Sequence, residues 1–322
     1  MGRARRAVGL TLVRLGVRGR IFAALPGLVR SARVRSAIRD DVPLVSVVIA
    51  TYNWSSVLRF AIASALRQTY PRFEVIVVGD GCTDDSEEVV RSFADPRVSW
   101  HNLPENSGHQ SVPNNTGIDL ARGDYIAYHG HDDIWLPTHL ATVMRPLLEG
   151  QGDLAYTVTE VLGPLEGGYR ALKGLSPSGR YTRNIWIPPS SLAHRKSLVD
   201  EIGPWRDYRT IVRPPDIDFV VRAHEHGNRL VPVNALTVFK FNSVYRRNSY
   251  IERPSYEQAR YFRRLEHERG FVYRELGAVA LATLRSLFVS ISRDLPQLPT
   301  EPDQPPPGWH VTQWRRIRGL ES

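Results

Sequence analysis

Two adjacent aspartates form the most chemically suggestive group in the sequence. Asp132 and Asp133 follow the short, mostly apolar and aromatic run from Tyr125 to His129, which is predicted to be a strand, and Pro137 is predicted to open a helix after them. Carboxylates at the carboxyl end of a strand in an α/β sheet lie where ligands usually bind. Their oxygens suit Mg²⁺ or Mn²⁺, which commonly bridge a protein carboxylate to substrate phosphates. The alternative, that both aspartates only start the helix, is open on these residues alone.

The elements around the aspartates predict an α/β fold. Residues 45–50 and 73–78 are continuous runs of mostly β-branched residues, typical of buried parallel strands. Strands alternate with helices at the spacing of βαβ units, which predicts a Rossmann-like, mostly parallel sheet flanked by helices. Further strands are expected at 98–101 and 154–161, a hairpin or flexible loop at 162–180, and helices at 55–68, 84–93, 113–121, 197–202, 216–226 and 255–292.

Three of these predicted strands end in polar residues. They are followed by Thr51-Tyr52, by Asp80 and by Asp132-Asp133, which should meet at one edge of the sheet. This combination calls for a ligand with both a hydrogen-bonding base and a phosphate–metal group. The chain has no Gly-x-Gly-x-x-Gly turn after its first strand, no P-loop and no Gly-x-Ser-x-Gly elbow, which argues against a dinucleotide-binding, P-loop or serine hydrolase site.

Charge is distributed unevenly along the 322 residues. The net charge is +9, but residues 1–39 contain ten arginines and no acidic residue, so the rest of the chain is close to neutral. Arginines interrupt every apolar run in this leader, so neither a signal peptide nor a membrane span is expected. A basic interfacial helix on anionic lipid and a solvated leader are both open, and no nucleic-acid module is present. The single cysteine, Cys82, fits a reducing compartment, hence a cytoplasmic protein, with peripheral contact at the inner membrane face as an alternative.

Several motifs, taken together, resemble family 2 glycosyltransferases. The resemblance covers roughly residues 44–240 and implies a GT-A fold, a nucleotide-sugar donor, a divalent metal ion and inversion at the anomeric carbon. The motifs that carry it, in order, are Val-Ser-Val-Val-Ile-Ala-Thr-Tyr-Asn (45–53), Val-Ile-Val-Val-Gly-Asp-Gly-Cys-Thr-Asp-Asp (75–85), Glu-Asn-Ser-Gly (105–108), Asn-Asn-Thr-Gly (114–117) and His-Asp-Asp-Ile-Trp-Leu-Pro (131–137).

The resemblance also implies roles for individual residues. Asp132 stands at the metal-binding end of the family's Asp-x-Asp motif, with Asp133 supporting it or facing the sugar. Asp80 is expected to accept a hydrogen bond from the base. Asp216 resembles the catalytic base, with Asp218 as a rival two residues further on. The remaining positions expected to contact the nucleotide-sugar are Thr51, Tyr52, Asn53, Asn106 and Asn115.

Departures from the family pattern leave two interpretations open. Gly130 replaces the first aspartate of the metal motif, Gly79 replaces the first of the usual Asp-Asp-Gly, and Asn114 stands where arginine is common. His129 or His131 could supply a metal ligand, although a supporting hydrogen-bonded role is the alternative for both. One interpretation is an active inverting enzyme of bacterial polysaccharide or cell-envelope glycan synthesis, which uses a UDP-sugar and a saccharide or glycoconjugate acceptor. The other is a degenerate relative that binds a nucleotide or a partner without turnover.

Four regions are expected. Residues 1–41 are the basic leader and 42–245 the glycosyltransferase domain. Residues 246–293 are predicted to be a helical extension packed on that domain, and 294–322 a proline-rich linker with a basic tail.

Overall fold

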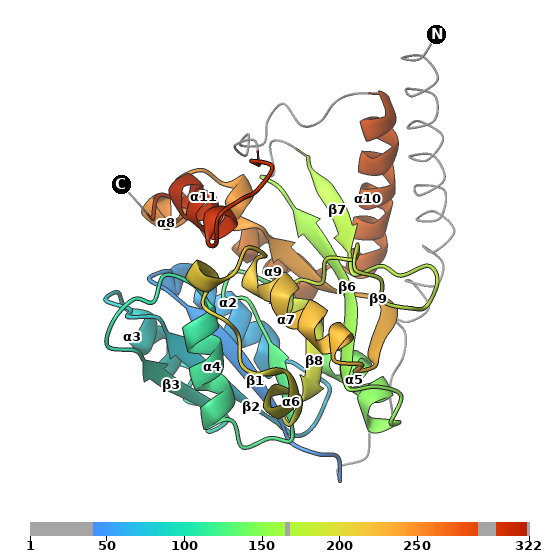
Figure 1. The fold of residues 1–322 in the computed structure, drawn as a ribbon. Helices are drawn as coiled ribbons and strands as arrows, with labels where there is room; N and C mark the ends of the chain where they lie inside the picture. The colour runs from blue at the N-terminus through green and yellow to red at the C-terminus, as the bar shows by residue number, and fades with distance from the viewer. Residues whose placement is uncertain (1–40, 165–167, 289–300, 321–322) are drawn as a thin grey trace.

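The computed structural model describes residues 41–164, 168–288 and 301–320. Within these ranges, nine strands form one curled sheet between layers of helices (Figure 1). The sheet order is β3-β2-β1-β4-β8-β6-β9-β5, with β7 paired to β6 outside this path. The predicted α/β class, a Rossmann-like sheet flanked by helices, is confirmed.

The first half of the sheet is parallel, as its β-branched sequence predicts. Strand β1 lies between β2 and β4, and its last residue, Thr51, is in register with Gly79 at the end of β2. The polar residues that follow these strands are therefore brought to the same edge. The strands of this half are β1 (Val45–Thr51), β2 (Phe73–Gly79), β3 (Val98–Asn102) and β4 (Tyr125–Tyr128).

The second half of the sheet is mixed. Strand β9 pairs with β6 in parallel, whereas β8 is antiparallel to both β4 and β6. The sequence did not predict β9, although it is the longest strand described, and the expected hairpin is β6 paired with β7. The strands of this half are β5 (Ile134–Trp135), β6 (Leu154–Leu162), β7 (Arg170–Lys173), β8 (Leu192–Arg195) and β9 (Leu230–Phe241).

Helices cover both faces of the sheet. One apolar cluster joins the odd-numbered side chains of β1 and β2 to α2, α3 and α5, and a second joins the opposite face to α4, α6 and α7. Alternate residues of the buried strands thus face different helical layers, as the strand repeat requires. These helices are α2 (Ser55–Leu66), α3 (Ser86–Arg91), α4 (Ser111–Leu120), α5 (His139–Leu148), α6 (Leu198–Ile202) and α7 (Pro215–Glu225).

The C-terminal helices pack on the end of the sheet. Tyr261 of α9 and Phe271 of α10 share an apolar cluster with Phe239 of β9. A buried ion network stabilises the same junction. In this network, Arg170 of β7 pairs with both Glu160 of β6 and Glu275 of α10. The remaining helices are α8 (Ser249–Glu252), α9 (Tyr256–His267), α10 (Phe271–Phe288) and α11 (Trp309–Arg318), with short 3₁₀ turns η2 (Pro189–Ser191), η3 (Tyr208–Thr210) and η4 (Ser243–Tyr245).

Some predicted boundaries were wrong. Helix α5 begins at His139 rather than Pro137, because residues 134–135 first pair with β9 as strand β5. The basic tail, expected as an extension of the linker, contains helix α11. The leader at 1–39 lies outside the described residues.

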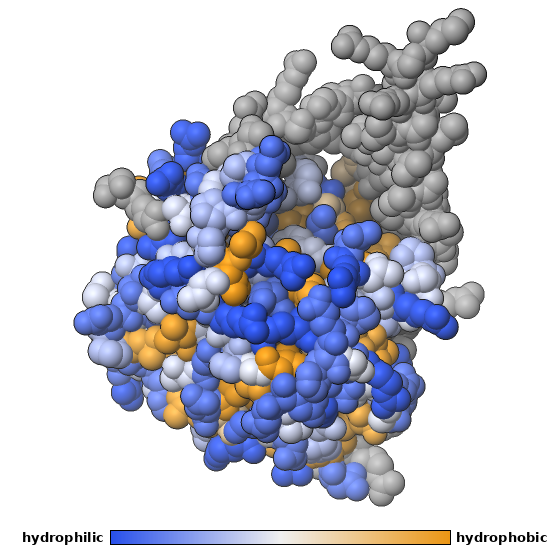
Figure 2. All heavy atoms as spheres, in the orientation of Figure 1, coloured by the Kyte–Doolittle hydropathy of each residue, from blue (hydrophilic) through white to orange (hydrophobic). Residues whose placement is uncertain are grey.

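No helix in the described ranges is long and apolar enough to cross a membrane. The face in Figure 2 is mostly hydrophilic, and its hydrophobic residues lie in small separate groups.

His194 of β8 is held neutral in the core. Its Nδ1 lies 2.7 Å from the carbonyl oxygen of Arg195 and its Nε2 lies 2.9 Å from the hydroxyl of Tyr128. Trp205 Nε1 donates to the Tyr128 hydroxyl, so the hydroxyl proton of Tyr128 is donated to Nε2 of His194. Because Nε2 is then an acceptor, Nδ1 carries the ring proton and donates to the carbonyl oxygen of Arg195. Burial lowers the pKa of His194 to about 4.

This histidine should make the fold acid-sensitive. The unfolded chain protonates the ring near its ordinary pKa, so the unfolded state binds one more proton as the pH falls from about 6.5 toward 4. His194→Gln should therefore remove about 1.4 kcal/mol per pH unit from the pH dependence of the unfolding free energy in that interval. Urea titrations at several pH values between 7 and 4.5 measure this slope, with the exposed His226→Gln as control. An unchanged slope in His194→Gln would show that His194 does not contribute.

Candidate active site

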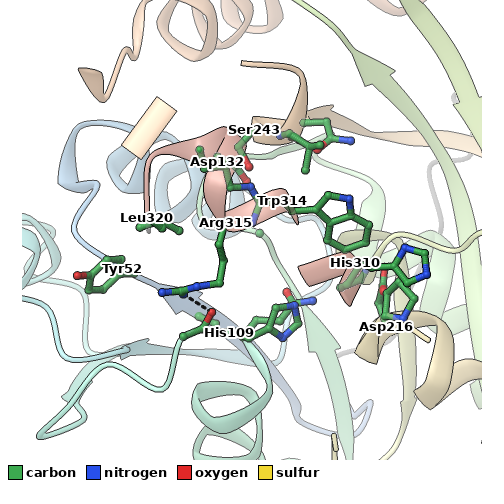
Figure 3. A pocket seen from close by; sticks show the side chains of 18 of the residues that line it. Tyr52, His109, Asp132, Asp216, Ser243, His310, Trp314, Arg315 and Leu320 are labelled. Carbon is green, nitrogen blue, oxygen red and sulfur yellow. Dashed lines mark hydrogen bonds between the residues drawn. The ribbon is translucent and has the colours of Figure 1, made fainter. Parts of the chain in front are cut away.

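A pocket of about 670 Å³ lies at the carboxyl ends of β1, β2 and β4. In Figure 3, Tyr52 and Asp216 stand on opposite sides of it, with Asp132 between them. The far wall comes from distant parts of the chain, namely the start of α7, the end of β9 and helix α11. Of the predicted site residues, six line the pocket: Thr51, Tyr52, Asp80, Asn106, Asp132 and Asp216.

Asp80 organises the loop on one side of the pocket. Its carboxylate accepts hydrogen bonds from the backbone N–H of Ser107 (2.9 Å) and Gly108 (3.3 Å) and from the side chain of Asn106 (3.0 Å). Burial raises the pKa of Asp80, although these hydrogen bonds oppose the shift. A carboxylate has about four acceptor positions, and these contacts already occupy most of them. A contact between Asp80 and a base thus stays a prediction.

A hydrogen-bonded chain crosses the floor of the pocket. Thr51 Oγ1 lies 2.8 Å from Nδ1 of His131, and the hydroxyl of Tyr250 lies 3.1 Å from Nε2 of the same ring. With both nitrogens engaged, His131 has the supporting role that was the alternative to metal binding. His129 is also turned away from the pocket, since it stacks on Trp135 and its Nε2 lies 3.0 Å from Ser64 Oγ.

Three residues that were predicted to contact the ligand do not line the pocket, namely Asn53, Asn115 and Asp133. The side-chain oxygen of Asn53 accepts from the backbone N–H of Thr83 (2.7 Å) and Asp84 (3.2 Å), which joins the loops after β1 and β2. The amide of Asn115 pairs with both backbone groups of Trp205 at 2.9 Å. Both asparagines therefore brace loops in this structure.

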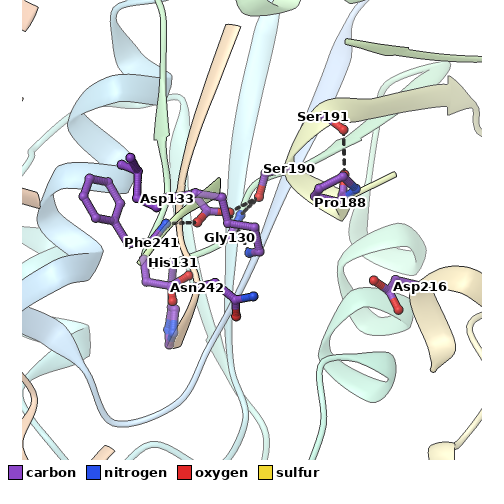
Figure 4. A network of polar contacts seen from close by, with 12 residues as sticks. Gly130, His131, Asp133, Pro188, Ser190, Ser191, Asp216, Phe241 and Asn242 are labelled. Atoms are coloured by element: carbon purple, nitrogen blue, oxygen red, sulfur yellow. Dashed lines mark hydrogen bonds and ion pairs between the residues drawn. The ribbon is translucent and has the colours of Figure 1, made fainter. Parts of the chain in front are cut away.

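The two adjacent aspartates have different environments. Asp132 lines the pocket, and no described residue donates a hydrogen bond to its carboxylate. Asp133 is fully buried and accepts from Ser190, from Lys240 Nζ at 3.1 Å and from the backbone N–H of Phe241 at 3.3 Å (Figure 4). Burial raises the pKa of Asp133 to about 6, against the opposing effect of the Lys240 ammonium group. Asp133 is thus held by contacts within the protein, whereas Asp132 is the one of the two that lines the pocket.

Gly130 stands where no side chain fits. A Cβ atom there would lie 2.6 Å from Oδ2 of Asp133 and 3.0 Å from Oγ of Ser190. The Asp133 carboxylate therefore occupies the space that an aspartate at position 130 would need. The packing of this turn thus leaves no room for a carboxylate side chain at position 130.

The described residues of the pocket offer few ligands to a divalent metal ion. Within the described ranges, no group of three or more His, Cys, Asp and Glu side chains could hold one. Mg²⁺, however, is usually bound by one or two carboxylates together with waters and substrate phosphates. The Asp132 carboxylate fits that second arrangement, in which the ligand completes the coordination.

Asp216 and Asp218 are separated by their contacts. Asp216 lines the pocket from the first turn of α7, and Trp186 Nε1 donates to its Oδ2 at 2.8 Å. Burial raises the pKa of Asp216, partly opposed by the Trp186 hydrogen bond. Asp218 instead pairs with Arg222 at 2.8 Å, and it does not line the pocket.

Several pocket residues were missed by sequence reasoning. Lys240 comes from the unpredicted strand β9, and His310, Trp314, Arg315 and Arg318 come from α11. The basic, tryptophan-containing tail was noticed in the sequence, but nothing local indicated which part of the fold it would meet.

Comparison with known proteins identifies the class and then the family. The structure is similar to S. aureus TarS residues 1–349 in complex with UDP-GlcNAc, with a TM-score of 0.52, 19% identity, and coverage of 77% of this chain and 74% of that one. It is also similar to the mannosyltransferase PcManGT from Pyrobaculum calidifontis in complex with GDP-Man and Mn²⁺, with a TM-score of 0.50, 15% identity and 88% coverage of both chains. The fold is that of a GT-A glycosyltransferase.

Sequence similarity defines the family. The model of glycosyl transferase family 2 matches residues 46–195. An uncharacterized glycosyltransferase of Rickettsia typhi is 33% identical over 143 residues, which is 44% of this chain and 43% of that protein. The uncharacterized glycosyltransferase YibD of Escherichia coli is 27% identical over 216 residues, which is 66% of this chain and 60% of that protein. Just under half of this chain thus matches the family 2 model, and the chain spans less than two thirds of the length of either relative.

The packing at Gly130 can be tested by adding a side chain. Gly130→Ala should lower the unfolding free energy by about 1–3 kcal/mol, because the new Cβ overlaps a buried carboxylate that cannot move without losing its partners. Gly130→Asp should lower the unfolding free energy further, since it places a second negative charge beside Asp133. Gly277→Ala in α10, where a Cβ meets nothing within 4 Å, is the matched control and should be neutral or stabilising. Denaturant unfolding measures all three, and a Gly130→Ala variant as stable as the wild type would refute the packing argument.

Proposed function

We propose that this protein is an inverting glycosyltransferase that moves a sugar from a nucleoside diphosphate donor to a hydroxyl group of a saccharide or glycoconjugate acceptor. The observation that carries the proposal is a single pocket at the family 2 strand ends that brings together Asp80, Asp132 and Asp216. These three carboxylates come from three separate segments, and each has a different set of partners. The arrangement supports a division into nucleoside recognition, metal–diphosphate binding and proton transfer.

Nucleoside binding is assigned to the Asp80 side of the pocket. Tyr52 offers an aromatic ring at the end of β1, and it stacks with Tyr250 at a centroid distance of 6.4 Å. The Asp80 carboxylate, already held by its loop, is fixed in position to accept from a base. UDP is the favoured nucleotide, supported by the TarS complex, although the GDP-mannose complex of PcManGT shows that this fold also accommodates guanosine.

Asp216 is proposed as the general base. An acceptor hydroxyl is a weak nucleophile until a positioned base takes its proton as the bond to the anomeric carbon forms. The bond from that carbon to the diphosphate breaks at the same time, and the nucleoside diphosphate leaves on the opposite face. Burial, which raises the pKa of Asp216, makes the carboxylate a better proton acceptor, and the Trp186 hydrogen bond fixes its orientation.

Asp132 is proposed to hold a Mn²⁺ or Mg²⁺ ion together with the donor phosphates. When bound, such an ion supplies Lewis-acid stabilisation of the departing diphosphate. The Mn²⁺ in the PcManGT complex supports metal use by this fold. Polysaccharide or cell-envelope glycan synthesis would be the biological setting, and the ten arginines of residues 1–39 would contact anionic lipid there.

The base assignment is tested by Asp216→Asn. The substitution keeps the shape and the Trp186 contact but removes the basicity, so the transfer rate should fall about a hundredfold or more while donor affinity hardly changes. Asp218→Asn is the matched control, because its partner is Arg222 and it lies outside the pocket. Measuring nucleoside diphosphate release from a panel of UDP-, GDP- and dTDP-sugars gives the rates. An active Asp216→Asn together with an inactive Asp218→Asn would move the base two residues along.

The metal assignment is tested by Asp132→Ala. Metal-dependent turnover should be lost, and the fold should be retained, because no described residue depends on the Asp132 carboxylate for a hydrogen bond. The same assay with and without Mn²⁺, together with a thermal melt of the variant, checks both parts. Near wild-type turnover in the variant would rule out this metal site. If the wild type binds nucleoside diphosphates but turns over no sugar in the panel, the degenerate-relative interpretation, kept open by Gly130, gains support.

A further inference from the structure

Helix α11 forms one wall of the candidate donor pocket, although it lies more than a hundred residues beyond the match to the family model. His310, Trp314, Arg315 and Arg318 all line the pocket from this helix. Figure 3 shows Trp314 and Arg315 reaching across from it, between Tyr52 on one side and Asp216 on the other. The pocket is therefore completed by a segment that the family domain does not contain.

The helix is fixed in this position by specific contacts. The backbone N–H of Gly308, just before the helix, donates to the carbonyl oxygen of Ile211 at 3.0 Å. Near the other end of the helix, the carbonyl oxygen of Ile317 accepts from the backbone N–H of Asn248 at 2.8 Å. Val311, in the first turns of the helix, has a buried side chain. Gly319 ends the helix at φ 79°, close against Ile251. The orientation of the α11 side chains is thus set by both ends of the helix.

Arg315 extends the wall that Asp80 organises. Its Nη1 donates to the carbonyl oxygen of Gly108 at 2.5 Å, and the N–H of that glycine donates to Asp80. The positive charge of Arg315 also opposes the burial that raises the pKa of Asp80. One end of α11 is therefore coupled directly to the loop on the proposed nucleoside side.

Arg318 supplies positive charge deeper in the pocket. Among the described residues, its Nε is buried with no hydrogen-bond partner, and no acidic side chain pairs with it. Its charge reaches the floor of the pocket: burial is the main cause of the lowered pKa of His131, and Arg318 lowers it further. Lys240, another cation that lines the pocket, is already paired with Asp133.

The attraction of arginine for a helix C-terminus does not account for this arrangement. Arg315, Arg316 and Arg318 all lie in the last turn, where the helix dipole favours cations. Arg316 is exposed, whereas Arg315 and Arg318, three residues apart on one side of the helix, both line the pocket. A buried guanidinium N–H without a partner in a pocket calls for an anionic ligand.

We propose that Arg318, with Arg315 beside it, binds the diphosphate of the nucleotide donor, so that α11 completes the donor site. The inference depends on the proposed function, since it assigns the phosphate contacts of that same pocket. A guanidinium group presents parallel N–H donors that match phosphate oxygens and stays charged at every relevant pH. Together with a metal ion at Asp132, these groups offset the charge that develops as the diphosphate departs.

Isothermal titration with UDP, UMP and uridine tests the assignment, with the GDP series used in the same way if the wild type prefers guanosine. Arg318→Ala should weaken UDP binding about tenfold or more, while uridine affinity stays within about twofold, because only the phosphates are contacted. Arg318→Lys should have a UDP affinity between those of the wild type and Arg318→Ala. Arg315→Ala should also weaken UDP binding, with some loss of uridine affinity because its contact with Gly108 on the nucleoside side is lost. Arg316→Ala, an exposed position on the same helix, is the matched control and should bind as the wild type does.

The outcomes separate this inference from the proposal on which it depends. A wild-type protein that binds no nucleoside diphosphate would overturn the proposed function itself. If the wild type binds UDP and Arg318→Ala binds it equally well, or loses UDP and uridine affinity in equal proportion, only the phosphate role of α11 fails. Tighter binding in Arg318→Ala would show instead that α11 obstructs the pocket, and this too would overturn the inference. Melting temperatures of the variants exclude loss of fold as the cause.

Discussion

The buried carboxylate of Asp133 is the contact on which the geometry of the pocket depends. It joins the turn after β4 to η2 through Ser190 and to β9 through Lys240 and the backbone of Phe241. Removing one partner of such a buried pair leaves an uncompensated charge, which costs far more than an exposed pair contributes. Three segments distant in sequence are thereby held together at the edge of the sheet. Because Asp133 meets these structural requirements, its neighbour Asp132 can face the pocket with no described hydrogen bond to its carboxylate.

The local half of this architecture could be predicted from sequence. Residues of β1 and β2 form continuous apolar runs, and parallel pairing brings the side chains after them, Thr51 and Asp80, to one edge. What could not be predicted depends on long-range contacts. Strand β9 mixes polar and apolar residues, and it forms because β6 and β5 pair with it on either side. The contact of Arg315 with Gly108 spans 207 positions, and no local pattern carries information about such a pairing. For the same reason, the loop contacts of Asn53 and Asn115 could not be read from their motifs.

Position 130 is a glycine rather than an acid, and α11 brings arginines to the pocket. Both features make the charge around the proposed diphosphate site less negative. A site with two carboxylates at a metal ion gains affinity for that ion but also adds negative charge beside a diphosphate. Here the Asp133 carboxylate, which fills the space next to Gly130, is paired with Lys240. The proposed site therefore places one carboxylate, Asp132, and the guanidinium groups of Arg315 and Arg318 around the donor diphosphate. Less of the diphosphate charge would have to be balanced by a metal ion than in a site built from carboxylates alone.

The separation of charges across the pocket is consistent with the two opposite demands of glycosyl transfer. The leaving diphosphate needs positive charge, whereas the incoming hydroxyl needs a base that positive charge would weaken by lowering its pKa. The guanidinium group of Arg315 lies on the Tyr52 side of the pocket, while Asp216 stands on the far side, bound to the neutral indole N–H of Trp186 (Figure 3). A neutral donor orients the carboxylate at a smaller cost in basicity than an arginine would. Asp218, which is paired with Arg222, lacks this advantage even though it lies on the same turn of α7.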